Sequence, residues 1–167
     1  MGRETMREII RRREVIIDDW RTIDEDPKGE SGQVILPLTR WHAERDRWWS
    51  WNGRIGVRIN PADRVELLRA DLARLALIAI EFPTPSEGRG YSQARVLRDR
   101  LGFTGEIRAV GHVKRDQIFF MARCGIDAFE LAQGVNPQSV LAAFDDFDVA
   151  YQPSTVPLKG QRGFYAT

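Results

Sequence analysis

The stretch ALIAIEF, residues 76–82, is the most apolar part of the chain and decides the expected fold class. A nearly unbroken apolar run of strand length is typical of a strand that is buried on both faces of a parallel sheet. The run is far too short to cross a membrane as a helix, which takes about 20 apolar residues. We therefore expect a central strand of an α/β domain here, and no membrane partner.

Strand-like and helix-like segments alternate around this stretch. The expected strands are VILP (34–37), RIGVRI (54–59), IRAVG (107–111), AFEL (128–131) and VAYQ (149–152). The expected helices are LTRWHAERDRWWSW (38–51), ADRVELLRADLARL (62–75), SQARVLRDRLG (92–102), KRDQIFFMARCG (114–125) and PQSVLAAFDDF (137–147). This rhythm indicates right-handed crossovers and a mostly parallel sheet with alternating helices. We expect an open three-layer sandwich, although the same rhythm also fits a partial β/α barrel.

The chain divides into three parts by composition. Residues 1–32 form an N-terminal arm, in which REVIIDDW (13–20) predicts a short strand or hairpin. Residues 33–152 form the α/β domain, and residues 153–167 form an irregular C-terminal tail.

The overall charge and the single cysteine limit the classes of function. There are 25 basic and 24 acidic residues, a net charge of +1, whereas nucleic-acid binders are normally more basic. One thiol, Cys124, cannot form an internal disulfide or hold an iron–sulfur cluster, and we expect no haem. Its apolar neighbours predict a buried, inert side chain. The N-terminus has no signal-peptide pattern, so we expect a cytoplasmic protein.

Both candidate architectures bind ligands at the carboxyl ends of their parallel strands. At this edge the segment EGRGYS (87–92) predicts an anion site. Gly88 and Gly90 would allow close backbone approach, Arg89 would offer a bidentate donor, and Ser92 would cap a helix start. The alternative is an ordinary turn before a capped helix. Gln93 stands where a dinucleotide fingerprint would have its third glycine.

The segment GHVKRDQ (111–117) adds cations to the same edge. Lys114 and Arg115 fall in the first turn of an expected helix, where each opposes the helix dipole at a cost of about 0.3–1 kcal/mol. A bound anion or an acidic partner would explain them, and a solvated pair of side chains is the alternative.

Four residues are candidates for acid–base chemistry: Glu81, His112, Asp116 and Glu130. The two glutamates end apolar strands, where burial would raise their pKa values. They could equally form ion pairs with Arg89, Arg108 or Arg123, and the histidine could be incidental. None of these residues has metal-ligand spacing, so we expect no metal.

Four tryptophans crowd residues 41–51. Trp41 and Trp48 are seven residues apart and share a helix face, which predicts a core position. Trp49 and Trp51 could form an exposed aromatic patch for a partner.

REVIIDDW, the block GRGYSQARVLRDRLGFTGEIRAVG (88–111) and RDQIFFMARCGIDAFEL (115–131) together resemble a bacterial family of uncharacterised proteins. Its members are commonly encoded beside genes for sulfite reductase and phosphoadenylyl-sulfate reductase, and are labelled loosely as oxidoreductases of sulfite assimilation. The resemblance extends from about Val15 to Tyr151. The chain departs from the family pattern at Glu87, where Asp is usual, and at His112, where an acid is usual.

Three functions fit these observations. The resemblance implies an accessory protein of assimilatory sulfite reduction that docks on the reductase, or on its electron donor, through the cationic edge. The residues also fit a small enzyme that binds an oxyanion or phosphorylated substrate, with Arg89 and Arg115 as anion clamps and Glu81 as base. The third is a non-catalytic interaction module that uses the tryptophans and the tail. No flavin or nicotinamide fingerprint is present, so the cofactor and any enzymatic activity stay open.

Overall fold

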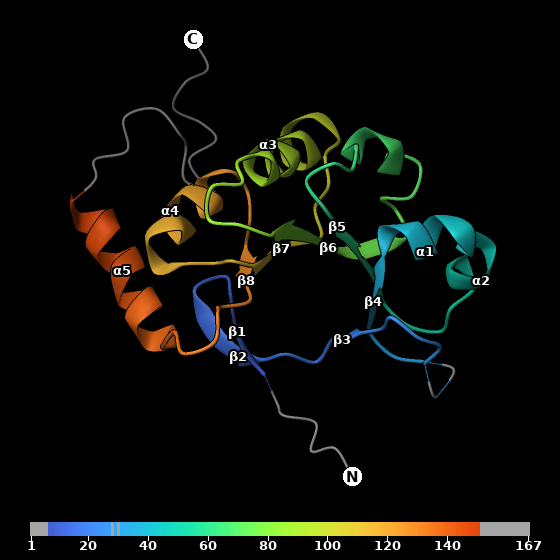
Figure 1. The fold of residues 1–167 in the computed structure, drawn as a ribbon, viewed down its shortest axis with the longest axis horizontal. Helices are drawn as coiled ribbons and strands as arrows, with labels where there is room; N and C mark the ends of the chain where they lie inside the picture. The colour runs from blue at the N-terminus through green and yellow to red at the C-terminus, as the bar shows by residue number, and fades with distance from the viewer. Residues whose placement is uncertain (1–6, 28, 30, 151–167) are drawn as a thin grey trace.

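A computed structural model describes residues 7–27, 29 and 31–150, and it contains one curled sheet in an arch-like half-barrel (Figure 1). The strand order is β2-β1-β8-β7-β6-β5-β4-β3. The strands are β1 (Glu8–Arg11), β2 (Glu14–Ile17), β3 (Arg21–Thr22), β4 (Val34–Pro37), β5 (Ile55–Ile59), β6 (Leu75–Phe82), β7 (Glu106–Gly111) and β8 (Ala128–Phe129). The α-helices are α1 (Leu38–Ala43), α2 (Arg45–Trp49), α3 (Arg89–Arg95), α4 (Arg115–Arg123) and α5 (Pro137–Ala150).

The expected fold, an open three-layer sandwich on a mostly parallel sheet, is wrong. Strands β3 to β8 are parallel, but β1 runs antiparallel to β8, and β2 runs antiparallel to β1. Arg12 and Arg13 join β1 to β2 with φ angles of 50° and 65°, the left-handed pair typical of a two-residue hairpin turn. The curled sheet is closer in shape to a partial barrel, but its antiparallel edge belongs to neither expected architecture.

The two faces of the sheet differ in what covers them. The helices lie along the outer face of the arch (Figure 1), where Trp41, Leu97 and Phe144 join the larger core. The concave face has a smaller core in which Trp20 packs with Ile35, Leu77 and Ala79. The chain between β2 and β3 supplies Trp20, so a loop segment, and not a second helical layer, fills the concave face.

The apolar stretch 76–82 forms most of β6, and its predicted central place is confirmed. Parallel neighbours β5 and β7 flank it on both sides. Ile78 and Ile80 point to the helical face, and Leu77 and Ala79 point to the concave face.

Several local expectations fail for identifiable reasons. Segment 62–75 contains only a 3₁₀ turn, Val65–Leu68. The side chain of Asp71 is buried and accepts hydrogen bonds from Trp41 (2.9 Å) and Arg45 (2.8 Å), so it fastens this segment to the neighbouring helices. Val149 and Ala150 end α5 and are not in a strand, while residues 151 and 152 of VAYQ lie outside the described residues.

A buried charge network fastens the N-terminal hairpin to the sheet. Arg108, at the middle of β7, has no exposed surface, and its Nη1 lies 2.9 Å from Asp18 Oδ2. Its Nε donates to Glu106 at 2.8 Å. Asp18 is also bound by Arg7 at 2.6 Å, and Arg7 reaches Glu130 at 2.7 Å. Strands β1, β7 and β8 and the segment after β2 are therefore joined by one set of ion pairs.

We expect Asp18→Ala to lower the free energy of unfolding by about 3–5 kcal/mol, because it leaves the buried Arg108 without a main counter-charge. Urea denaturation measures this. The control is Asp24→Ala, since Asp24 is 74% exposed and lies 3.6 Å from Arg58, a surface pair worth about 0–1 kcal/mol. Equal losses in both variants would contradict a stabilising role for the buried network.

Candidate functional site

The loops after β6 and β7 lie side by side at the carboxyl edge of the sheet. Phe82 pairs with Gly111 at the ends of these strands, and the His112 amide donates to the Phe82 carbonyl at 2.7 Å. The Gln117 side chain donates to the Pro85 carbonyl at 2.9 Å, which ties the start of α4 to the loop after β6. The residues of EGRGYS and GHVKRDQ thus meet at one edge.

Arg89 is already bound to a carboxylate of its own chain. Its Nε and Nη2 lie 3.0 Å from the two carboxylate oxygens of Glu87, whose Oε1 also accepts the Arg89 amide at 2.9 Å. These hydrogen bonds hold the pKa of Glu87 below its ordinary value and raise the pKa of Arg89. Arg89 is exposed, but its bidentate fork is occupied, so it is not a free anion clamp.

The two glycines around Arg89 have different environments. A Cβ on Gly90 would lie 2.6 Å from ring atoms of Phe82, so this glycine lets α3 pack closely on β6. Gly88 immediately precedes α3, and a Cβ placed on it would have no other atom within 4 Å. Ser92 lies inside α3 on its exposed side, so its predicted role as N-cap is wrong. Gln93 is buried and donates to the Asn60 and Asp63 carbonyls at 2.9 and 3.0 Å.

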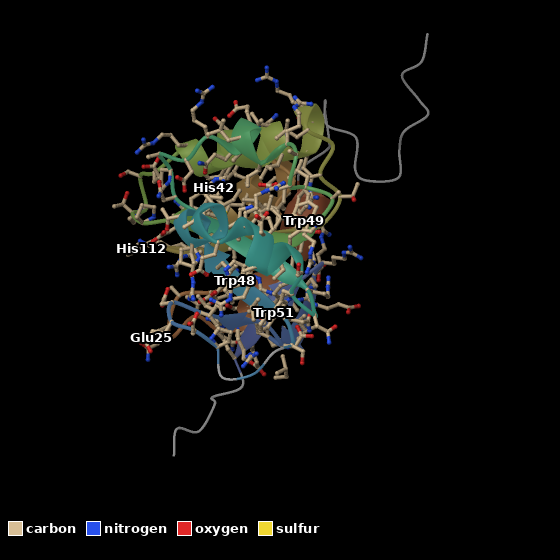
Figure 2. All side chains as sticks on the ribbon, turned by 90° about the vertical axis from the view of Figure 1, so that its right-hand side faces the viewer. Glu25, His42, Trp48, Trp49, Trp51 and His112 are labelled. Carbon is tan, nitrogen blue, oxygen red and sulfur yellow. The ribbon has the colours of Figure 1, made fainter. Side chains whose placement is uncertain are left out.

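The start of α4 exposes two cations. Lys114 precedes the helix, Arg115 is its first residue, and Asp116 follows; all three side chains are exposed. Within residues 7–150 as described, neither cation has an ion pair. His112 is exposed beside them, and Figure 2 shows it with Glu25 at the left margin of the view, away from Trp49 and Trp51.

Glu81 and Glu130 share one row on the concave face. Glu81 pairs with Val110 across β6 and β7, and the register of Ala109 with Phe129 places Glu130 beside Val110 on the other side. With strands about 4.8 Å apart, the two Cα atoms are separated by roughly 10 Å. Both residues are half-buried, and Glu130 is bound to Arg7. Glu81 has no ion pair in the described part of the chain.

The sequence analysis missed Arg7 and Asp18, which connect Glu130 to Arg108. Arg108 itself carried a signal, because an arginine in the middle of an apolar strand requires buried counter-charges. No sequence signal pointed to Asp18, because Asp18 meets Arg108 of β7 only once the hairpin has formed. The expected partners of Glu130 were Arg89, Arg108 and Arg123, whereas the residue that binds it directly is Arg7.

The tryptophans and the cysteine are mostly structural. Trp41 and Trp48 are fully buried and Cys124 is buried, which confirms all three core predictions. Trp49 is 41% exposed, with the Arg45 guanidinium 4.7 Å from its ring centroid. The Trp51 indole donates to the Gly32 carbonyl at 3.0 Å.

Other features offer little chemistry. A pocket of about 340 Å³ lies at the opposite, amino end of β6, and its lining has no titratable side chain; it consists of Leu72, Ala73, Leu75, Gly102, Phe103, Thr104 and Gly105. Among the described residues, no three His, Cys, Asp or Glu side chains gather as metal ligands would. No helix in the same part of the chain has the length and apolarity to cross a bilayer.

Residues 56–159, from β5 through the carboxyl-edge loops and α5, match the family described as bacterial protein of unknown function, DUF934. The chain belongs to the DUF934 family. The resemblance to an uncharacterised bacterial family is thereby confirmed. No curated protein matches the chain. The matched residues include every candidate site residue of the DUF934 chain but not Arg7 or Asp18.

We expect Gly90→Ala to lower the free energy of unfolding by about 1–3 kcal/mol, because its Cβ would overlap the Phe82 ring. Gly88→Ala is the matched control two residues away. It should be nearly neutral, since its surroundings are open and its backbone is already right-handed, with φ of −99°. Thermal unfolding of both variants measures the difference, and equal stability would refute the packing role of Gly90.

We expect the Glu87 carboxylate to titrate below its ordinary pKa of 4.5, and Arg89→Ala to raise that pKa toward the ordinary value. Because folding lowers this pKa, the stabilising contribution is present above the ordinary value and is lost as the pH falls through the lowered one. Carbon-detected NMR titration of the side-chain carboxyl measures both. Arg95→Ala, on the exposed side of α3, is the control and should leave Glu87 unchanged.

Proposed function

We propose that this DUF934 protein is a cytoplasmic accessory protein of assimilatory sulfite reduction. It docks on sulfite reductase, or on the electron donor of that enzyme, through the exposed cations at the carboxyl edge. The role in sulfur assimilation rests on the resemblance of the 88–131 block. The observation that supports docking is the pair Lys114 and Arg115, exposed at the start of α4 without an ion pair among the described residues.

The placement of these cations favours a negatively charged ligand. Positive charge at a helix start opposes the helix dipole, and a carboxylate or oxyanion nearby would reverse that cost. The open edge suits an acidic protein surface, and it could also hold a small oxyanion such as sulfite. Arg89 belongs to the same edge, but its pairing with Glu87 makes it a fixed part of the surface.

A second candidate is a small enzyme that binds an oxyanion or phosphorylated substrate. The observation that favours it is the shared row of Glu81 and Glu130 on the concave face. Glu81 would be the base, since Glu130 is held by Arg7.

Complementation of a deletion strain tests the proposal. The deletion should slow growth on sulfate or sulfite and spare growth on sulfide or cysteine. Wild type should restore growth on all four sources, whereas Lys114→Glu/Arg115→Glu should fail on sulfate and sulfite because it reverses the docking charge. Arg64→Glu/Arg69→Glu is the matched control, since it makes the same charge change at two exposed arginines near the 3₁₀ turn.

The outcomes separate the candidates. Normal growth of the deletion strain on all four sources, in a genome without a second copy, would overturn the role in sulfur assimilation. Glu81→Gln should complement if the protein acts by docking and should fail if it acts as the proposed enzyme. Equal growth of the two charge-reversal variants would overturn docking through Lys114 and Arg115.

A further inference from the structure

The outer side of β2 is an unpaired sheet edge in the described structure. The Asp18 amide donates to the Arg7 carbonyl at 2.7 Å, so Arg7 and Asp18 form a hydrogen-bonded pair of the hairpin. Such pairs alternate along an antiparallel ladder. The Ile9–Ile16 pair is therefore also hydrogen-bonded, and the backbone groups of Val15 and Ile17 point outward, away from β1.

We propose that β2 pairs antiparallel with the β2 strand of a second copy of this chain and joins the two sheets across a two-fold axis. In the register that uses every outward group, Val15 lies opposite the partner's Ile17, and Ile17 lies opposite the partner's Val15. Each of these pairs exchanges two hydrogen bonds. Ile16 then sits on the axis, opposite the partner's Ile16.

The two edges of the sheet are not equally protected. The β3 edge is only two residues long, and short edge strands resist pairing. The β2 edge has four residues, EVII, with no proline, lysine or bulge to block a partner strand. Ile17 is 49% exposed, and the proposed pairing would place the partner's Val15 beside it.

The charges around β2 favour a second copy in antiparallel orientation. Basic residues precede the apolar strand and acidic residues follow it, in the sequence RRREVIIDD (11–19). The proposed register places Arg13, whose guanidinium lies 5.0 Å from the Phe144 ring centroid, opposite Asp19 of the second copy. Within one chain the Asp19 side chain is 58% exposed and lies 3.9 Å from Arg11. Glu14 would face the partner's Asp18, but an aspartate at that position is already neutralised between Arg7 and Arg108. The pairing does not depend on the proposed role in sulfite reduction.

Single-cysteine cross-linking of the full chain tests the register. Ile16→Cys should form a covalent dimer under mild oxidation, because the two Cα atoms would lie about 4.5 Å apart in a non-hydrogen-bonded pair, within disulfide range. Ile17→Cys should cross-link much more slowly although Ile17 is more exposed. The Cα atoms of residue 17 in the two copies would be about 8–9 Å apart, beyond the roughly 7 Å Cα–Cα limit for a disulfide. Wild type, whose Cys124 is buried, is the background control.

Sedimentation velocity over a range of concentrations tests the association itself. Wild type should dimerise reversibly, and Ile17→Lys should raise the dimer Kd by about tenfold or more, which corresponds to at least about 1.4 kcal/mol. Leu67→Lys makes the same change at a residue that is 63% exposed outside the sheet, and it should leave the Kd unchanged. A wild-type chain that stays monomeric, equal effects of the two lysines, or cross-linking of Ile17→Cys as fast as Ile16→Cys would overturn the proposal.

Discussion

The burial of Arg108 is the constraint on which the rest of the fold depends. A guanidinium with no exposed surface must be matched by carboxylates, because an uncompensated charge in the interior costs several kcal/mol. Glu106 lies on the same strand as Arg108, whereas Asp18 follows directly after β2, the second strand of the N-terminal hairpin. Asp18 can reach Arg108 only if the chain after β2 crosses the concave face. That crossing places Trp20 in the smaller core and leaves no room there for a helical layer.

The molecule has two unlike surfaces near the carboxyl edge of its sheet. On the concave side, Arg7 joins Asp18 to Glu130, while Glu81 has no ion pair in the described part of the chain. On the helical side, Lys114 and Arg115 stand at a helix start with no carboxylate of the described chain bound to them. Exposed cations attract a negatively charged group electrostatically, and this attraction is largely screened beyond about 8 Å at physiological salt.

Sequence alone predicted the parts whose cause is local. The strands at 34–37, 54–59, 76–82 and 107–111 follow from apolar runs, and α4 and α5 follow from helical spacing with Gly125 and Pro137 at their limits. The edge position of the cations followed from the order of strands and helices. The failures have non-local causes. The segment 62–75 has helical spacing, but the buried Asp71 is fastened to Trp41 and Arg45.

The anion-site residues show both limits. Arg89 and Glu87 are two residues apart, so their pairing could have been predicted from the sequence. Gly90 is required because the Phe82 ring, eight residues earlier on β6, lies against it, and that contact depends on the fold. The pattern of glycines around an arginine did not separate a ligand site from close packing, because both require the absence of a side chain.

The extent of the DUF934 match adds a last consequence of the Arg108 constraint. The match begins at residue 56, inside β5, so it includes Arg108 and Glu106 but not Asp18. It also includes β8, whose outer edge is covered by β1. Residues 56–150 alone would keep a buried arginine with half its counter-charge and would expose the backbone of β8 to water. The matched region is therefore not a separate folding unit: its most buried charge and both of its sheet edges, β8 and β5, are completed by residues that precede it.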